Sequence, residues 1–259
     1  MITQKIYSEK RIVTTTKASV INIKGLYKSF GKLNDVLKGV DLKVEKGENL
    51  VVLGKSGSGK SITIKCLVGL VNADKGEIKV FDTDIASLDY KQLNELRLRI
   101  GFLFQNSALY DSMSVRKNLE FPLRRHSKNL TSKEVEEMII DTLESVGLGE
   151  AIDKMPSELS GGMRKRIGLA RTLILKPEII LYDEPTTGLD TITSREISEL
   201  ILAIQKKNKT SSIIITHDMA CAKLTSDRLV ILKDGTIQAE GTYEALENSK
   251  EDWVRSFFI

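Results

Sequence analysis

One short segment combines the residue types that bind phosphate groups. It fits the pattern G-x-x-x-x-G-K-[ST] and lies between an apolar run and a helical pattern. Its residues are Gly54, Lys55, Ser56, Gly57, Ser58, Gly59, Lys60 and Ser61. Glycines let successive N–H groups point at phosphate oxygens, and the following helix N-terminus adds positive potential. Lys60 can then reach β- and γ-phosphates while Ser61 ligates Mg²⁺, so the segment predicts a phosphate site; a flexible Gly/Ser loop is the alternative.

Two carboxylates follow a buried, strand-like run over residues 179–182. Asp183 is expected at the carboxyl end of that strand, near the Mg²⁺ that Ser61 would hold. Glu184 is then placed to polarise a water molecule for attack on the γ-phosphorus. A solvated acidic turn at the end of a strand is the alternative, but the pairing with the phosphate loop favours the catalytic interpretation.

A second glycine-containing loop precedes a helix at Leu159-Ser160-Gly161-Gly162-Met163. The glycines there predict another anion-binding helix N-terminus. Because one nucleotide needs only one such loop, we expect this loop to serve a nucleotide bound to another copy of the fold. A flexible helix entry is the alternative. The basic run at residues 164–166 is expected to be a solvated face.

These groups must be positioned by strands and helices that the sequence also indicates. Period-two or continuous apolar patterns predict strands over residues 20–26, 40–44, 49–53, 76–81, 179–182, 212–215, 228–233 and 236–240. Helices are expected after Lys60 and over residues 193–205. From about residue 90 to 175 the pattern becomes mostly helical, with Leu93, Leu96 and Ile100 at helical spacing and a capping box at Thr131 and Glu134. This region predicts a helical insertion in an α/β chain.

Composition excludes several classes. The chain has 259 residues, 41% of them hydrophobic and 29% charged, which excludes collagen, coiled coil and general disorder. Lys and Arg outnumber Asp and Glu by 39 to 35, a balance too mild to indicate a nucleic-acid partner. No segment is apolar enough to span a bilayer, and the polar N-terminus does not resemble a signal peptide. Cys66 and Cys221 have no metal-ligand spacing and are interpreted as small buried hydrophobes, which fits a reducing compartment.

In order along the chain, these motifs resemble the ATP-binding cassette (ABC) ATPases over about residues 20–245. The resemblance implies an α/β P-loop NTPase fold, an ABC-type nucleotide-binding domain with an antiparallel β subdomain and an inserted helical subdomain. It implies ATP and Mg²⁺ as cofactors. Phe30 looks like the aromatic residue that stacks on adenine, with Tyr27 the less favoured candidate. Gln105 looks like the glutamine that contacts Mg²⁺ and links to a membrane partner. Asp190 resembles the aspartate at the dimer seam, and His217 the histidine at the γ-phosphate.

The same resemblance implies a division of the chain and a dimer. It implies an N-terminal tail (residues 1–18), an ATPase domain (19–245) with a helical subdomain at about 103–172, and a C-terminal extension (246–259). Two copies would pair head to tail, with each ATP between residues 54–61 of one copy and residues 160–162 of the other. Catalysis would then depend on Glu184, His217 and Lys60. One departure is the turn at residues 81–85, where many relatives have a glycine and this chain has none.

Three stretches, residues 101–115, 118–124 and 155–163, look like the ATPase of the Mla-type, MCE-linked phospholipid transport system. That resemblance implies a permease dimer and an MCE-type lipid-binding protein as partners, with this chain on the cytoplasmic face of the inner membrane. Residues 105–124 would meet the permease, although core packing is the alternative for Phe121 and Leu123. The apolar residues Trp253, Phe257, Phe258 and Ile259 are expected to dock on the ATPase surface or across the dimer. A small-solute importer ATPase remains an alternative, and a soluble ABC ATPase of translation or DNA repair is less favoured.

Overall fold

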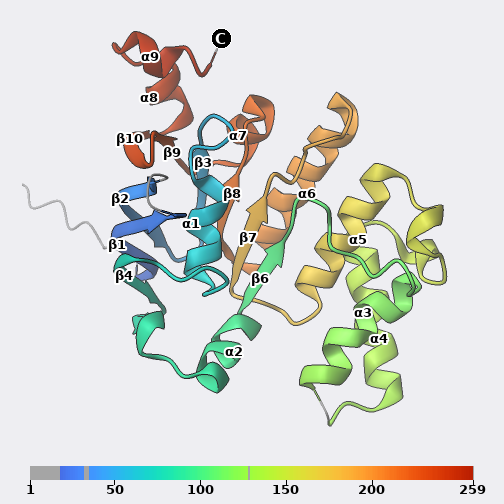
Figure 1. The fold of residues 1–259 in the computed structure, drawn as a ribbon. Coiled ribbons are helices and arrows are strands. Elements are labelled where there is room, and N and C mark those ends of the chain that lie inside the picture. Colours follow the sequence, from blue (N-terminus) through green and yellow to red (C-terminus); the bar gives the residue numbers. More distant parts are fainter. Residues whose placement is uncertain (1–17, 32–34, 128, 259) are drawn as a thin grey trace, which may run out of the picture.

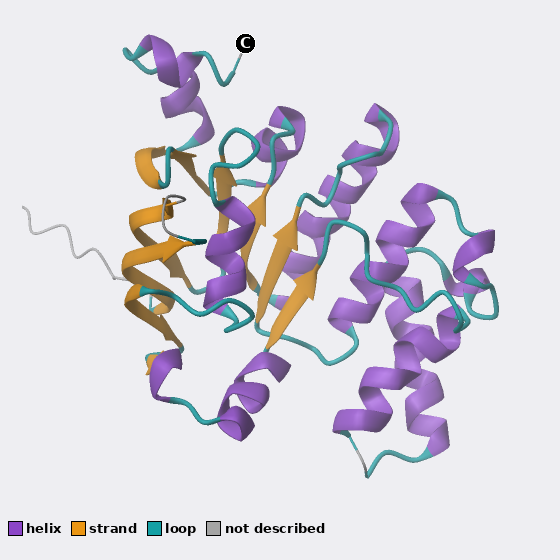
Figure 2. Cartoon of the chain, in the orientation of Figure 1, coloured by secondary structure: helices purple, strands orange, loops and turns teal. Residues whose placement is uncertain are grey.

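The computed structural model describes residues 18–31, 35–127 and 129–258, and they form two sheets surrounded by helices (Figures 1 and 2). The first sheet is antiparallel, in the order β2-β1-β4-β5. Its strands are β1 (Ser19–Ser29), β2 (Asp35–Glu45), β4 (Lys75–Val80) and β5 (Thr83–Asp84). The first two are longer than the pattern predicts, because the pairing of β1 with β2 continues through Tyr27, Lys28 and Ser29.

The second sheet has the order β10-β9-β3-β8-β7-β6. All neighbours are parallel except the hairpin of β9 and β10. Its strands are β3 (Asn49–Leu53), β6 (Ile100–Leu103), β7 (Ile179–Asp183), β8 (Ser211–Ile215), β9 (Arg228–Lys233) and β10 (Thr236–Gly241). The expected hairpin turn at Asp234 and Gly235 joins the last two, and both turn residues have positive φ.

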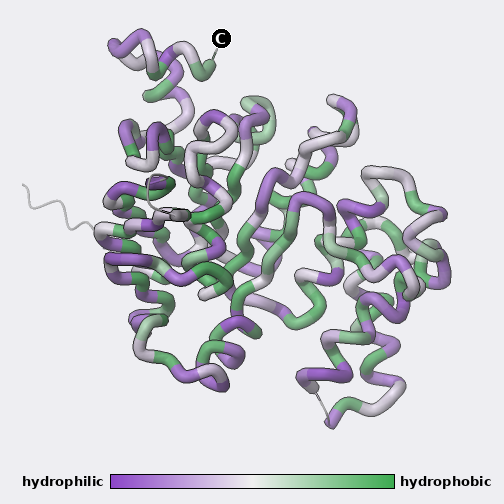
Figure 3. Tube along the Cα trace, in the orientation of Figure 1, coloured by the Kyte–Doolittle hydropathy of each residue, from purple (hydrophilic) through white to green (hydrophobic). Residues whose placement is uncertain are grey.

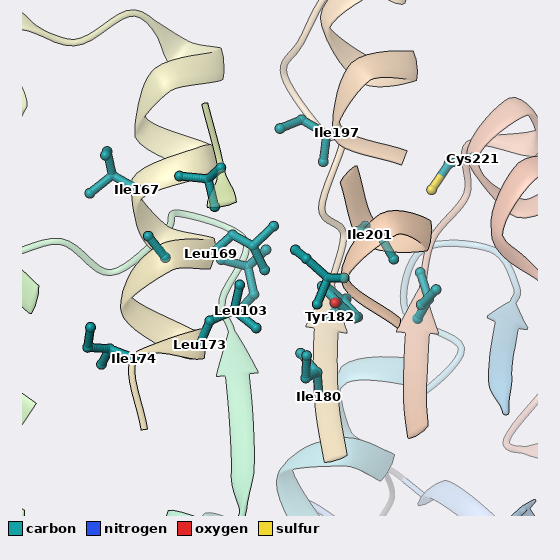
Figure 4. Close-up of a cluster of buried hydrophobic side chains, with 14 of the residues drawn as sticks. Leu103, Ile167, Leu169, Leu173, Ile174, Ile180, Tyr182, Ile197, Ile201 and Cys221 are labelled. Atoms are coloured by element: carbon teal, nitrogen blue, oxygen red, sulfur yellow. The ribbon is translucent and has the colours of Figure 1, made fainter. Parts of the chain in front are cut away.

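Both faces of this sheet are covered, which explains the continuous apolar runs in its strands. Along β7, Ile179 and Leu181 belong to the cluster that faces the antiparallel sheet, while Ile180 and Tyr182 belong to the cluster that faces the helices. Figure 4 shows the second cluster, in which Ile180 and Tyr182 lie between side chains of two flanking helices. Burial raises the pKa of the Tyr182 hydroxyl. The alternation therefore fixes the rotation of β7 and the direction in which its last residues point.

The helices that precede the C-terminal residues fall into two groups. The first group flanks the sheets, and its members are α1 (Lys60–Leu67), α2 (Tyr90–Leu98), α6 (Thr191–Asn208) and α7 (Met219–Thr225). The second group lies together beyond β6 at the right of Figure 1, and its members are α3 (Val115–His126), α4 (Ser132–Ser145) and α5 (Gly161–Leu173). Short 3₁₀ turns occur at Ile85–Ser87, Gly149–Ala151 and Pro156–Glu158. The capping box expected at Thr131 and Glu134 is confirmed.

One expected helix position is wrong. Ile100 continues the spacing of Leu93 and Leu96, but the helix ends at Leu98 and Ile100 begins β6. The parallel pairing of Ile100 with Ile179 accounts for this, because sheet hydrogen bonds outweigh a local apolar spacing.

The glycine-free turn also differs from an ordinary loop. Phe81 and Asp82 connect β4 to β5 as a two-residue hairpin turn, and both have positive φ, at 49° and 63°. This conformation normally favours glycine or asparagine. The Arg99 guanidinium lies 3.7 Å from the centre of the Phe81 ring and covers it.

The C-terminal residues pack against the chain's own fold. They form α8 (Tyr243–Glu247), across the expected boundary at residue 246, and α9 (Asp252–Arg255). Trp253, Phe257 and Phe258 contact the core cluster, and the rings of Phe258 and Tyr243 meet edge to face at 5.1 Å. Docking on the ATPase surface thus occurs within one chain. Ile259 lies outside the described residues.

Among the described residues, none of the helices combines the length and the apolar character needed to cross a bilayer. Figure 3 shows hydrophilic and hydrophobic residues interspersed along the helices.

Candidate functional site

The parallel strands β3, β6, β7 and β8 have their carboxyl ends at the same edge of the large sheet (Figure 1). The phosphate loop follows β3. Asp183 is the last residue of β7, and Glu184 comes directly after it. His217 lies just after β8, and Gln105 lies just after β6. Open α/β sheets bind their ligands at this edge, since helix N-termini and loop residues converge there. Sequence-distant candidates are therefore brought together by the strand order.

The phosphate loop leaves a helix N-terminus free for an anion. Gly59 is the N-cap of α1, with φ of 103° and no side chain to accept from the first-turn N–H groups. The other described helices of eight or more residues have a capping side chain, supplied by Asp89, Ser114, Thr131, Ser160 and Asp190. Because uncapped N–H donors need a partner, the start of α1 suits a phosphate group.

Lys60 lies buried beneath this loop. Its Nζ donates to the carbonyl oxygens of Gly54 at 2.7 Å and Lys55 at 3.1 Å. Burial lowers the pKa of the Lys60 ammonium, while the negative charges of Glu184 and Asp183 act in the opposite direction. Gly54 has no room for a side chain, since a Cβ there would lie 2.3 Å from the Leu232 carbonyl oxygen. The loop is thus folded tightly around its lysine.

Two oxygen ligands for a cation lie side by side. The Ser61 hydroxyl donates to Asp183 Oδ1 at 2.7 Å, although 122 residues separate them. Hydroxyl and carboxylate oxygens are the donors that Mg²⁺ prefers. No group of three or more His, Cys, Asp or Glu side chains suited to a metal occurs in the described part of the chain. Mg²⁺ would therefore take its remaining ligands from nucleotide phosphates and water, which is its usual habit.

Glu184 is held at the same edge in an unusual backbone conformation. Its φ is 53°, and its N–H donates to the Ile215 carbonyl oxygen at 2.9 Å. Its Oε2 lies 2.8 Å from Nδ1 of His217 and accepts from the Thr187 hydroxyl at 3.1 Å. The second carboxylate oxygen, Oε1, has no such contact among the described residues, so it is available to a water molecule.

Most of these groups, though not Asp183 or Thr187, line one cavity of about 520 Å³. Its lining includes residues of the phosphate loop (Ser56, Gly57, Gly59, Lys60 and Ser61) together with Gln105, Glu184, His217 and Phe30. Phe30 is 46% exposed there, whereas Tyr27 does not line the cavity. Lys55 and Ser58 line the adjacent cavity on the outer side of the loop, next to Trp253 and Phe257.

The remaining candidates lie outside this cavity within one chain. Ser160 caps α5 by accepting from the Met163 N–H at 3.2 Å, and Gly161 and Gly162 form the first turn of that helix. Asp190 caps α6 through the N–H and hydroxyl of Thr193, and these hydrogen bonds lower the pKa of its carboxyl group. Gly162 faces α6, since a Cβ there would lie 2.5 Å from Thr193 Cγ2.

The expectation that residues 164–166 form a solvated basic face is wrong for Lys165, while Arg164 is exposed as expected. Lys165 is buried and Arg166 pairs with Glu196 at 2.7 Å. The helical spacing of the sequence indicates this burial, because Lys165 lies on the same face of α5 as Gly168 and Leu169, which are both buried. Thr187, which holds Glu184, is a second residue that the motifs did not single out.

The fold and this edge define a P-loop nucleotide-binding protein. Residues 37–187 match the family model of the ABC transporter. The chain is similar to the probable ribonucleotide transport ATP-binding protein mkl of Mycobacterium leprae, with 42% identity over 92% of this chain and 68% of that protein. It is also 39% identical to Protein TRIGALACTOSYLDIACYLGLYCEROL 3, chloroplastic, of Arabidopsis thaliana, over 92% of this chain and 73% of that one.

Two solved structures have the same fold. The post-hydrolysis dimer of the ATP-binding cassette MJ0796, bound to ADP and Pi, has a TM-score of 0.79 and 30% identity over 86% of this chain and 98% of that one. The cbiO1 protein of Clostridium perfringens, part of the cbiONQ transporter complex, has a TM-score of 0.82 and 28% identity over 90% and 92% of the two chains.

The chain therefore belongs to the ABC transporter family, as its ATP-binding subunit. The predicted ABC-type P-loop fold, the ATPase class and the cofactors ATP and Mg²⁺ are confirmed at the level of the family.

Proposed function

We propose that this chain hydrolyses ATP at the cavity described above and thereby drives a membrane transporter. The adenine base stacks on Phe30, and the phosphates lie on the N–H groups of residues 54–61. Lys60 neutralises the β- and γ-phosphates, and Ser61, Asp183 and Gln105 would hold Mg²⁺, which would supply further charge neutralisation when bound. The observation that supports this most strongly is the Ser61–Asp183 contact of 2.7 Å beside the uncapped start of α1.

Glu184 is the proposed general base. Its free Oε1 accepts a proton from the attacking water, while His217 and Thr187 hold the other oxygen. His217 is 65% exposed at its side chain, so it can also reach a γ-phosphate in the cavity. The attacking water and the γ-phosphorus are thus brought together by residues of the loops that follow β7 and β8.

A second copy completes each site in this proposal. Four predicted site residues lie outside the nucleotide cavity of their own chain: Ser160, Gly161, Gly162 and Asp190. The first three are predicted to bind an anion, and Asp190 is predicted to lie at the dimer interface. A head-to-tail dimer gives these residues a nucleotide to contact. The dimeric state of the similar MJ0796 cassette supports this arrangement.

The membrane partner is proposed to dock beside Gln105. Phe104, Tyr110 and Phe121 are exposed by 36%, 41% and 37%, and the rings of Tyr110 and Phe121 meet edge to face at 5.3 Å. Leu123 is fully buried and belongs to the core. Core packing, the alternative for Phe121 and Leu123, therefore holds for Leu123 and not for the exposed Phe121. Exposed aromatic residues that contact each other favour an apolar partner helix.

For the cargo, we propose phospholipid, moved between inner and outer membranes with a permease dimer and an MCE-type protein. The three Mla-like stretches support it, and so does the name of the Arabidopsis relative, which contains the name of a lipid. The chain would lie at the cytoplasmic face of the inner membrane. A small-solute importer is the second candidate, because the mycobacterial relative is named for ribonucleotide transport.

Affinity purification of the tagged chain from gently solubilised membranes tests the cargo. Recovery of a permease with an MCE-domain protein and bound phospholipid supports lipid transport. Recovery of a permease with a solute-binding protein replaces the lipid with a small solute. Recovery without any permease contradicts both.

A further inference from the structure

Of the two buried lysines in the described part of the chain, Lys60 and Lys165, the proposed mechanism does not use Lys165. It lies on α5, one turn after Ser160–Gly162, and only 6% of it is exposed. Both of its hydrogen-bond acceptors are main-chain carbonyl oxygens: that of Gln105 and, at 3.3 Å, that of Glu184. Burying an ammonium group is costly, so a lysine at this position needs a function that a neutral residue does not supply.

The two segments that Lys165 joins both have strained backbones. Glu184 has a φ of 53°, and Ser107 and Ala108, just after Gln105, have φ of 59° and 48°. Non-glycine residues adopt such angles only where surrounding contacts impose them. A donor that reaches the main chain on both sides of the cavity is suited to impose them.

The same face of α5 supports one of these segments at two further points. A Cβ at Gly168 would lie 2.7 Å from Ser107 Cβ, so only glycine lets the segment approach the helix this closely. Arg171 donates to the Ala108 carbonyl oxygen and covers the Tyr110 ring at 4.6 Å. The segment that begins at Gln105 is therefore held against α5 at three residues, Lys165, Gly168 and Arg171. Glu184 accepts a hydrogen bond from that helix through Lys165.

We propose that Lys165 is a positioning residue for ATP hydrolysis, joining the main chain at Gln105 to the main chain at Glu184. Gln105 and Glu184 both line the nucleotide cavity, from the ends of adjacent strands β6 and β7. Lys165 sets their separation, and hence the place of the attacking water relative to Mg²⁺. Because Ser160 caps the N-terminus of α5, the same contact makes both segments move together with the loop that would contact the partner copy's nucleotide.

Charge and length make lysine suitable here. Its ammonium offers three donors on a long stem, enough to satisfy two carbonyl oxygens at once. Burial lowers the pKa of Lys165, and the charges of Glu184 and Asp183 counteract that effect. Replacement by methionine keeps most of the volume but leaves the carbonyl oxygens of Gln105 and Glu184 without this donor.

The test uses the full-length chain with Lys165→Met, Lys165→Gln and the control Lys133→Met. Lys133 lies on α4 with its side chain 86% exposed. Lys165→Met is expected to lower kcat on the order of 10- to 100-fold while the Kd for ATP changes less than about threefold. Hydrogen exchange should accelerate in the peptides around residues 104–109 and 184–188. Lys165→Gln, which retains N–H donors, should recover part of both properties, and Lys133→Met should resemble the parent protein.

Two outcomes overturn the proposal. One is unchanged kcat and unchanged exchange in Lys165→Met. The other is a parallel loss of ATP binding, thermal stability and kcat in Lys165→Met and Lys165→Gln alike, which indicates a general packing role. The inference rests on Glu184 as the base, and Glu184→Gln tests that separately. An active Glu184→Gln contradicts the proposed base, whereas an inactive Glu184→Gln beside a fully active Lys165→Met contradicts only the positioning role.

Discussion

Replacing Glu184 by glutamine is expected to stop ATP turnover without disturbing the fold. The two hydrogen bonds at Oε2, from Thr187 at 3.1 Å and with His217 Nδ1 at 2.8 Å, can both be kept by an amide oxygen in the same place. The backbone bond from the Glu184 N–H to the Ile215 carbonyl oxygen does not involve the side chain. Stability should therefore change little, by less than about 0.5 kcal/mol.

The loss in rate follows from removing the base. An amide cannot accept the proton of the attacking water, and general-base catalysis contributes about 10²–10⁴ in rate, or roughly 3–5 kcal/mol. Removing the negative charge also lessens repulsion with the γ-phosphate, so ATP should remain bound and the ATP-bound dimer should accumulate. Phosphate release measures the first effect, and size-exclusion chromatography with ATP and Mg²⁺ measures the second.

Glu178→Gln is the matched control. Glu178 immediately precedes β7, at the end opposite Glu184, and pairs with Arg99 at 2.6 Å on the surface. The same carboxylate-to-amide change there should leave kcat unaltered and lower stability by less than about 1 kcal/mol. Parental ATPase activity in Glu184→Gln, or equal losses in both variants, would refute the assignment of the base.

Phe30→Ala should weaken ATP binding about 3- to 10-fold in a fluorescence titration, because stacking contributes roughly 0.5–1.5 kcal/mol, whereas Tyr27→Ala should have little effect; the reverse order would exchange their roles. Asp82→Gly should raise the free energy of unfolding by about 0.5–1 kcal/mol and Tm by about 2 °C in calorimetry, since glycine removes the cost of left-handed backbone while adding some unfolded-state entropy. An unchanged or lower Tm would mean that the turn is not strained. Burial raises the pKa of the Cys66 and Cys221 thiols to about 11, so both should stay neutral at pH 8 and react with a disulfide reagent only after unfolding. Fast labelling of the native chain at pH 8 would contradict that burial.

The sequence predicted the site best where all the residues that a chemical function needs lie close together in the chain. The phosphate loop needs its glycines, lysine and serine within eight positions between a strand and a helix, and the structure has that arrangement. It also predicted the strands of the large sheet other than β6, and the central ones are apolar runs because both faces of the sheet are buried. It failed at Ile100, where an apolar spacing fits a helix and a strand equally well.

Residues that act through distant partners could not be found in this way. The charged run at residues 164–166 has the composition of a solvated face, and only the packing of α5 against the loops after β6 and β7 buries Lys165. The sequence favoured Phe30 over Tyr27, and the structure gives the reason: Phe30, just after β1, lines the cavity, whereas Tyr27, within β1, does not. Local composition does not determine which elements become neighbours.

The sequence by itself determined the chemistry available to this protein: a phosphate loop, a pair of carboxylates and a second glycine loop, each defined by residues close together in the chain. The tertiary structure decided which of these groups meet. Ser61 reaches Asp183 across 122 residues and Glu184 reaches His217 across 33, because parallel strands β3, β8 and β7 end at one edge of the sheet. Such contacts depend on strand order, which is set by the burial of both sheet faces and not by any local pattern.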